Sequence, residues 1–221
     1  MRWKPLHHIL AQHLYTPVMV AITGPAGSAP RSITGLAVTG STGFVRNDLP
    51  KTMAGVVRVD AVHLNGSSTT SVLSHTFDSL PPSTLQWFDA TAATQACPPT
   101  SCVLVSSVID TATKATVATN VQLQAPPHQL ELRKDTVVTF KVALVASPDG
   151  TVAIAVTTSS ATAVAVVLTT SAAGYFSENV FTATPGDRTV RFVPFAAEDM
   201  DEVLAQLKST TRVEHMAQHI V

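Results

Sequence analysis

The stretch that decides the fold is Gly-Tyr-Phe-Ser-Glu-Asn-Val-Phe-Thr-Ala-Thr-Pro-Gly-Asp-Arg-Thr-Val-Arg-Phe-Val-Pro-Phe, residues 174–195. It is typical of a loop, a short strand, a tight turn and a closing strand. Proline presets φ early in a turn and glycine tolerates positive φ, so the sequence predicts a turn at 184–187. Beyond it, Val190 and Phe192 alternate with polar neighbours, the two-residue period of a half-buried strand. We expect the edge of a β-sandwich here, and no catalytic centre.

The composition favours a folded chain that is rich in strands. Hydrophobic residues make up 45% of the 221 residues and charged residues 13%, so a large core can form. Threonine and valine are frequent, and their branched side chains favour strands. The net charge of −1 offers no basic stripe for a nucleic-acid partner. No run reaches the 18 or more apolar residues that a membrane span needs.

The second half carries the cleaner strand pattern. With Glu131–Leu132 and the two strands of the opening stretch, its alternating residues predict six or seven strands in about 70 residues, which suggests a small immunoglobulin-like sandwich. The alternating residues are Val138, Phe140, Val142 and Leu144, then Val152, Ile154 and Val156, then Val164, Val166 and Leu168.

The first half shows strand candidates at the spacing of a second sandwich. Asn65-Gly66 predicts a hairpin turn because both residues accept positive φ. Ala125-Pro126-Pro127 breaks the pattern, and we place a domain boundary there. The strand candidates are Leu36–Thr39, Val56–Leu64, Ser71–Phe77 and Cys102–Ile109.

Two amphipathic helices are expected at the ends of the chain. Trp3, Leu6, Leu10 and Leu14 recur at helical spacing, and so short a helix is marginal alone, which suggests the last helix of a larger domain upstream of Met1. A second helix is predicted from the apolar positions Met200, Val203, Leu204 and Leu207 and the acidic residues at its start.

The predicted fold class is therefore all-β. Two consecutive immunoglobulin-like sandwiches, 17–125 and 126–195, follow an N-terminal helix at 1–16 and precede a short helix and tail at 196–221.

Three further residues are candidates for covalent chemistry. Cys97 and Cys102 flank Pro98-Pro99. We interpret the cysteines as small apolar residues, because the prolines could hold the two thiols apart, and a loop disulfide is the alternative. Asn65-Gly66-Ser67 matches the acceptor pattern for N-glycosylation, usable if the chain is secreted. The N-terminus has no signal-peptide pattern.

Other polar and aromatic residues favour structural interpretations. Glu178 is interpreted as a loop acid that hydrogen-bonds locally. His7, His8 and His13 are interpreted as interface residues rather than metal ligands. Trp87-Phe88 could stack on a sugar, but packing under a loop is the preferred interpretation.

Three separated segments resemble the β-mannosidases of glycoside hydrolase family 2. Residues 2–8 and 15–20 resemble the end of that family's catalytic barrel, 120–127 resembles the junction between its two C-terminal sandwiches, and 174–181 followed by Pro185-Gly186 resembles its Gly-x-Phe-Ser-Asp-Asn-x-Phe signature. His128 and Glu178 stand where the family has lysine and aspartate. The family-signature residues of this chain are Trp3, Leu6, His7, Pro17, Asn120, Pro127, Gly174, Phe176, Ser177, Asn179, Phe181, Pro185 and Gly186.

The resemblance implies a function for a longer protein. The full enzyme would hydrolyse terminal non-reducing β-D-mannose residues of oligosaccharides and glycoproteins with retention, using two glutamates on barrel strands upstream of this chain. The chain itself would then hold no catalytic, cofactor-binding or metal residue and would act as a scaffold for the barrel, inactive alone. Family members are lysosomal, secreted or, in some lineages, cytoplasmic, so the location stays open. The alternative is a stand-alone β-sandwich that binds carbohydrate or protein.

Overall fold

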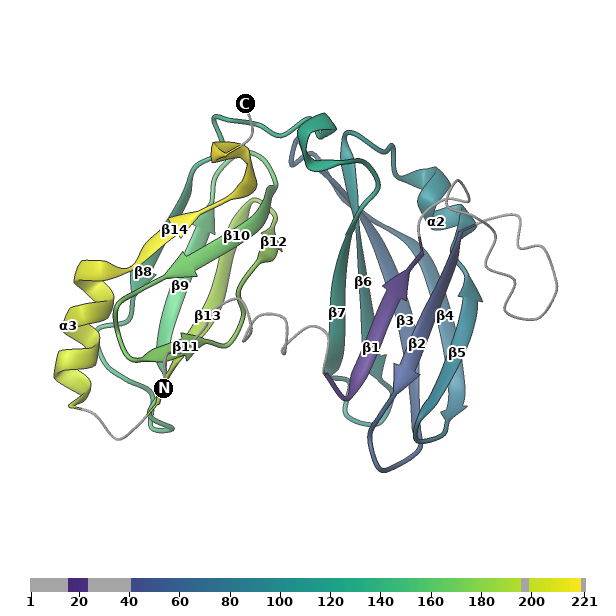
Figure 1. Cartoon of the computed structure of the whole chain (residues 1–221), viewed down its shortest axis with the longest axis horizontal. Helices are drawn as coiled ribbons and strands as arrows, with labels where there is room; N and C mark the ends of the chain where they lie inside the picture. Colours follow the sequence, from purple (N-terminus) through teal and green to yellow (C-terminus); the bar gives the residue numbers. More distant parts are fainter. Residues whose placement is uncertain (1–15, 24–40, 196–198, 220–221) are drawn as a thin grey trace. The chain divides into compact units, whose positions relative to one another are not determined.

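A computed structural model provides the structure of the chain and describes residues 16–23, 41–195 and 199–219 (Figure 1). The expected N-terminal helix, with Trp3, Leu6 and His7, and the expected strand Leu36–Thr39 lie outside these residues. Backbone contacts group the chain into two compact units. The first extends to Leu130, and the second begins at Glu131 and also includes Leu64–Ser67.

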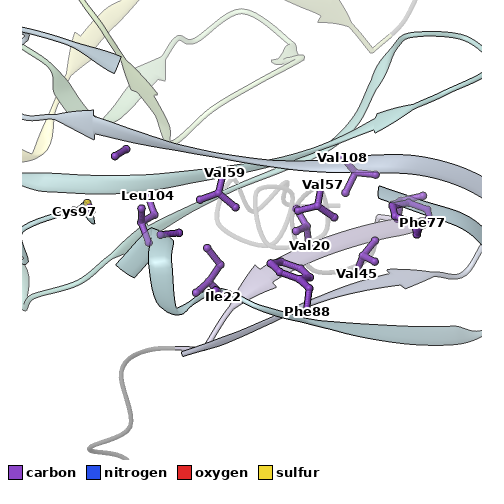
Figure 2. Packing of buried hydrophobic residues seen from close by; sticks show 14 of the residues in the cluster. Val20, Ile22, Val45, Val57, Val59, Phe77, Phe88, Cys97, Leu104 and Val108 are labelled. Atoms are coloured by element: carbon purple, nitrogen blue, oxygen red, sulfur yellow. The ribbon is translucent and has the colours of Figure 1, made fainter. Parts of the chain in front are cut away.

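The first unit is a sandwich of two antiparallel sheets. Val20, Val45 and Phe88 of the smaller sheet point toward Val57 and Leu104 of the larger one, and all five side chains are buried (Figure 2). The core therefore forms where the apolar faces of two alternating patterns meet. The smaller sheet has the order β1 (Val18–Ile22), β2 (Thr42–Asn47) and β5 (Thr84–Asp89), and the larger has the order β4 (Thr69–Leu80), β3 (Met53–His63), β6 (Cys102–Asp110) and β7 (Thr116–Leu123).

The predicted hairpin between β3 and β4 is present, with a detail that differs from the expectation. Its loop spans 64–68 and closes with a hydrogen bond from His63 N to Ser68 O of 3.2 Å. Gly66 has a φ of +76°, whereas Asn65 is not among the residues with positive φ. A two-residue hairpin turn of type I′ requires positive φ at both of its central residues. This loop has five residues and can therefore reverse the chain with positive φ at Gly66 alone.

The second unit is also a sandwich of two antiparallel sheets. Val152, Ile154, Val156 and Val166 are fully buried between them, as their alternation predicts. One sheet has the order β11 (Gly174–Phe176), β13 (Gly186–Pro194), β9 (Val152–Thr158) and β8 (Val138–Val142), and the other has the order β12 (Phe181–Ala183), β10 (Ala163–Thr169) and β14 (Arg212–Glu214). The prediction of an all-β fold with two consecutive immunoglobulin-like sandwiches is confirmed.

Within the deciding stretch the structure corrects two expectations. Residues 174–176 form strand β11 where a loop was expected, and β13 is an interior strand where a sheet edge was expected. β13 pairs with β11 on one side and with β9 on the other. The polar residues that alternate along β13 face solvent from one side of the sheet, and this exposed face is what resembled an edge.

Two other expected β positions differ from the structure. Glu131–Leu132 is not a strand, and β8 ends at Val142, which leaves the Leu144 side chain 78% exposed. The seventh strand of the sandwich is supplied instead by β14, which pairs with β10.

The predicted C-terminal helix is α3 (Met200–Thr210). The Asp199 side chain caps it by accepting a hydrogen bond from Asp201 N, and Val203, Leu204 and Leu207 are buried in the core of the second unit. The segment expected to be a tail contains β14 and the short helix η2 (Met216–Gln218), so it belongs to the sandwich. The remaining short helices are α2 (Thr91–Ala96) and η1 (Pro127–Gln129).

Candidate functional site

The signature at 174–186 packs onto the interior strand β13. Gly174 and Phe176 lie on β11, directly beside Pro194 and Phe192 of β13. A Cβ atom on Gly174 would stand 2.3 Å from Cζ of Phe192 and 2.5 Å from the Val193 carbonyl oxygen, so only glycine fits. The Phe176 and Phe192 rings meet edge to face with centroids 5.4 Å apart. These two signature residues therefore build the core.

Ser177 fastens the chain to β13 immediately after β11 ends. Its backbone N–H donates to Arg191 O at 2.6 Å, and its Oγ accepts from Arg191 N at 3.0 Å. The hydroxyl is thus used as a backbone substitute. In this role it is no candidate nucleophile.

Asn179 joins the loop between β11 and β12 to the opposite sheet. Its Nδ2 donates to Leu168 O at 2.9 Å, and its Oδ1 accepts from Leu168 N at 2.8 Å. The same Oδ1 accepts from Val180 N at 3.1 Å, and Val180 has a φ of +57°, which is rare for a branched side chain. The amide of Asn179 therefore replaces a missing strand partner and holds an otherwise unfavourable turn.

Glu178 makes an ion pair on the surface of the sandwich. Both Nε and Nη2 of Arg188 donate to its Oε2. The guanidinium of Arg188 also lies over the Phe181 ring, 4.8 Å from its centroid. The local role expected for Glu178 agrees with this arrangement, which links β13 to the start of β12 and leaves the carboxylate bound to a cation.

The predicted turn at 184–187 connects the two sheets of the second unit. Gly186 has a φ of +120°, in the region that favours glycine, and Pro185 precedes it at a bend. β12 pairs with β10, whereas β13 pairs with β9 and β11, so the turn carries the chain from one layer to the other.

The other described signature residues lie in the first unit. Pro17 O accepts from Asp48 N at 2.6 Å at the start of β1. Asn120 lies on β7 opposite Ser106 of β6. Pro127 is exposed and opens η1. These residues therefore belong to a different unit from the signature at 174–186.

The acidic side chains with altered pKa values are ordinary surface groups. Hydrogen bonds from Thr91 lower the pKa of Asp89, and those from the loop after β6 lower the pKa of Asp110. A hydrogen bond from Arg133 lowers the pKa of Asp135, and hydrogen bonds from Thr151, followed by the charge of Arg191, lower the pKa of Asp149. None of these directions is that of a general acid, which needs a raised pKa.

Within the described parts of the chain, no three His, Cys, Asp or Glu side chains gather where they could hold a metal ion. No helix in those parts is long and apolar enough to cross a membrane.

Among the residues that the structure describes, no loop covers the Trp87 side chain, which lies on an exposed sheet face, and this corrects the preferred interpretation. It is 39% exposed on β5, and Phe44 is its cross-strand neighbour on β2. The two rings meet edge to face at 5.4 Å. Phe88 points the other way and is buried. The period of two along β5 separates the neighbouring aromatic residues onto opposite faces.

Cys97 and Cys102 form a disulfide, the alternative of the two interpretations. The bond joins the end of α2 to the start of β6, and both cysteines are fully buried. Pro98-Pro99 do not hold them apart, because the chain turns with a hydrogen bond from Ser101 N to Pro98 O.

His215 is a buried polar residue that the sequence did not point to. Nε2 lies 3.1 Å from Thr136 O, and the buried ring stands at the start of η2, where its side chain faces the backbone N–H of Gln218 in a capping box. Burial lowers the pKa of His215, although the hydrogen bond to Thr136 opposes this. The two partners are 79 positions apart in the sequence, so no local sequence pattern indicates this contact.

Comparison with known proteins identifies the second sandwich. Residues 132–219 match the family Ig_mannosidase, an Ig-fold domain. A search of curated protein sequences finds no match.

Solved structures extend the similarity of fold to nearly the whole chain. A β-D-mannosidase from Dictyoglomus thermophilum has a TM-score of 0.65 at 15% identity, over 97% of this chain and 23% of that one. The exo-β-D-glucosaminidase CsxA has a TM-score of 0.54 at 15% identity, over 95% of this chain and 26% of that one. A variant of the exo-chitosanase CsxA from Amycolatopsis orientalis has a TM-score of 0.52 at 14% identity, with the same coverage.

This chain thus spans about a quarter of the length of the chains that it resembles. At such low identity the likeness establishes a common fold. Residues 132–219 are therefore an Ig-fold domain of the mannosidase type, in a chain whose two consecutive sandwiches share the fold of these glycosidases.

Proposed function

We propose that the chain is the C-terminal, non-catalytic part of a β-mannosidase-like enzyme of glycoside hydrolase family 2. The match of residues 132–219 to the Ig_mannosidase family carries this proposal. The similarity of fold to a much longer β-D-mannosidase over 97% of the chain supports it. The complete enzyme would release terminal non-reducing β-D-mannose residues from oligosaccharides and glycoproteins with retention of configuration.

In this proposal the parts of the chain have separate roles. Residues 1–16 are the last helix of the catalytic barrel, 17–125 form a middle sandwich, 126–195 form the C-terminal sandwich, and 196–221 supply its helix and final strand. The upstream barrel is the partner, and it carries both catalytic glutamates.

The signature residues support a scaffold role over a catalytic one. A retaining glycosidase places two carboxyl groups about 5–5.5 Å apart, and one of them must carry a proton to give to the leaving group. The carboxylate of Glu178 is occupied by a surface ion pair with Arg188. Gly174, Phe176 and Asn179 are occupied by the packing and hydrogen bonds of the sandwich. Their chemistry is that of holding a rigid support.

The first test measures hydrolysis of nitrophenyl β-D-mannoside by the purified 221-residue chain. We expect no nitrophenol release above the rate in buffer. Turnover that disappears in the Glu178→Gln variant would contradict the scaffold role, and Asp187→Asn, which alters a nearby acid on the same strand as Arg188, is the matched control. Sequencing the gene upstream of Met1 is the second test, and we expect an open frame that encodes barrel strands with two glutamates.

A stand-alone carbohydrate-binding sandwich is the second candidate, because the exposed Trp87 of β5 pairs with the half-buried Phe44 of β2. An aromatic face of this kind stacks on sugar rings. Titration of the chain with mannose oligosaccharides, followed by tryptophan fluorescence, distinguishes the two. Saturable binding that Trp87→Ala removes, together with an upstream sequence that encodes no barrel, would favour the binding module.

A further inference from the structure

The loop between β3 and β4 presents an acceptor sequence for N-linked glycan on the surface of the protein. Asn65, Gly66 and Ser67 form the sequence Asn-x-Ser, with x different from proline. Asn65 and Ser67 are both exposed. Acceptance of a glycan requires this exposure, because the attached sugars must remain in solvent.

The geometry of the loop accommodates a modified Asn65. Its Oδ1 accepts from Ser67 N at 2.9 Å, and in the described chain its Nδ2 donates no hydrogen bond. The pairing of β3 with β4 ends at Val62 and Thr69, so the asparagine lies beyond the last pair of the ladder. A substituent on Nδ2 therefore costs neither a hydrogen bond of the loop nor one of the sheet.

A second, independent observation concerns the redox conditions in which the chain folds. Cys97 and Cys102 are fully buried and joined by a disulfide, and the structure contains no free cysteine among the residues that it describes. Disulfides persist in oxidising compartments and are rare where glutathione keeps thiols reduced. In eukaryotic cells the compartment that forms disulfides also attaches N-linked glycans to this sequence.

We propose that Asn65 accepts an N-linked glycan when the chain folds in an oxidising secretory compartment. The co-reactant is an oligosaccharide carried on a lipid diphosphate. Nδ2 of Asn65 forms a bond to the anomeric carbon of the first sugar, and the bond from that carbon to the diphosphate oxygen breaks. Nδ2 loses one proton to a base, and the lipid diphosphate leaves. No atom changes its oxidation state.

The experiment expresses the full 221-residue chain behind a cleavable signal peptide in eukaryotic cells and measures the intact mass of the secreted protein. We expect a glycan mass that peptide N-glycosidase removes, leaving aspartate at position 65. Asn65→Gln and Ser67→Ala each lose the whole glycan mass. Ser68→Ala, which changes the next serine of the same loop outside the acceptor sequence, retains it.

Ser67→Thr separates loss of the acceptor from loss of the fold, because it preserves the acceptor sequence and we expect it to keep the glycan. Each variant is also checked for cooperative unfolding and for the absence of reactive thiols. A secreted, oxidised and folded chain with an unmodified Asn65 overturns the proposal. A glycan that persists in Asn65→Gln overturns it as well.

Discussion

At the scale of single residues, the signature of the second sandwich is explained by hydrogen bonds and packing that each side chain makes. Asn179 shows this most clearly, because one amide group satisfies both backbone groups of Leu168. An asparagine side chain has the donor and the acceptor that a neighbouring strand would otherwise provide. Arg188 has a comparable dual role, since it binds Glu178 and covers Phe181.

We expect Asn179→Ala to lower the free energy of unfolding by about 1–3 kcal/mol, because it leaves two partly buried backbone groups without partners. Asn179→Asp should also destabilise the protein, since its carboxylate cannot donate to the Leu168 carbonyl. Denaturant titration measures both. Glu178→Gln is the matched control, and it should cost less than about 1 kcal/mol because its ion pair is exposed. Equal losses in the control and in Asn179→Ala would contradict the assigned role.

His215 predicts a dependence of stability on pH. Its Nε2 donates to the Thr136 carbonyl, so the neutral ring carries its proton there, and a second proton on the buried Nδ1 would find no acceptor in the described chain. Burial lowers the folded-state pKa below the ordinary 6.5. The unfolded chain therefore binds the proton more tightly. The contribution of neutral His215 to the free energy of unfolding is therefore fully present above about pH 6.5. It decreases as the pH falls toward the lower folded-state pKa.

One such group can change stability by at most about 1.4 kcal/mol per pH unit. Urea titrations between pH 7.5 and 5 measure how the free energy of unfolding changes with pH. The His215→Gln variant should lose the part of this pH dependence that His215 causes. The surface aspartates act in a separate window, because their pKa values lie below 3.8 and their contribution is lost only in stronger acid. An unchanged slope in His215→Gln would show that the buried imidazole is not the titrating group.

At the scale of elements, β13 organises the second sandwich. It is the longest strand of its sheet, it lies between β11 and β9, and its apolar residues Val190 and Phe192 are completely buried. Its polar residues reach outward to partners on other segments, as Arg191 does to Asp149 at 2.9 Å and Arg188 does to Glu178. The strand therefore contributes to the core with one face and to surface ion pairs with the other.

We expect Phe192→Ala and Phe176→Ala each to lower the free energy of unfolding by roughly 3–5 kcal/mol, because each removes a ring from a packed aromatic pair and leaves a cavity. Leu144→Ala removes an apolar side chain from an exposed position and should change stability by less than about 0.5 kcal/mol. Chemical denaturation followed by circular dichroism measures all three. A loss below about 1 kcal/mol in the phenylalanine variants would show that the rings are not part of the core.

At the scale of the whole molecule, each sandwich has a core of its own. Separate buried clusters fill the first and second units, and the Ig_mannosidase match coincides with residues 132–219 of the second. A sandwich with a closed core and paired strands meets the physical conditions for independent folding.

We therefore expect residues 131–221, expressed alone, to unfold cooperatively in urea and to retain the pH dependence that His215 confers. The disulfide lies outside this fragment, so reducing agent should leave its unfolding midpoint unchanged. The same fragment with Phe192→Ala is the control for a weakened core. A fragment without a cooperative transition would contradict independent folding of the second sandwich.

The sequence alone determined the class of the fold and the faces of most strands. Alternation placed Ile154, Val190 and Phe192 in the core, and helical spacing placed Leu207 there, because a local period reports which face of an element is apolar. The resemblance of residues 174–186 to a known signature indicated the mannosidase type of domain, in agreement with the family match of residues 132–219.

Only the tertiary structure decided which elements became neighbours. It placed β13 inside its sheet, added β14 to the second sandwich, joined Cys97 to Cys102 and put Trp87 on an open face. It also brought Asn179 to Leu168 and His215 to Thr136. The physical reason is that strand pairing and buried hydrogen bonds connect residues far apart in the chain, whereas periodicity and turn chemistry carry information only about residues close to each other in sequence.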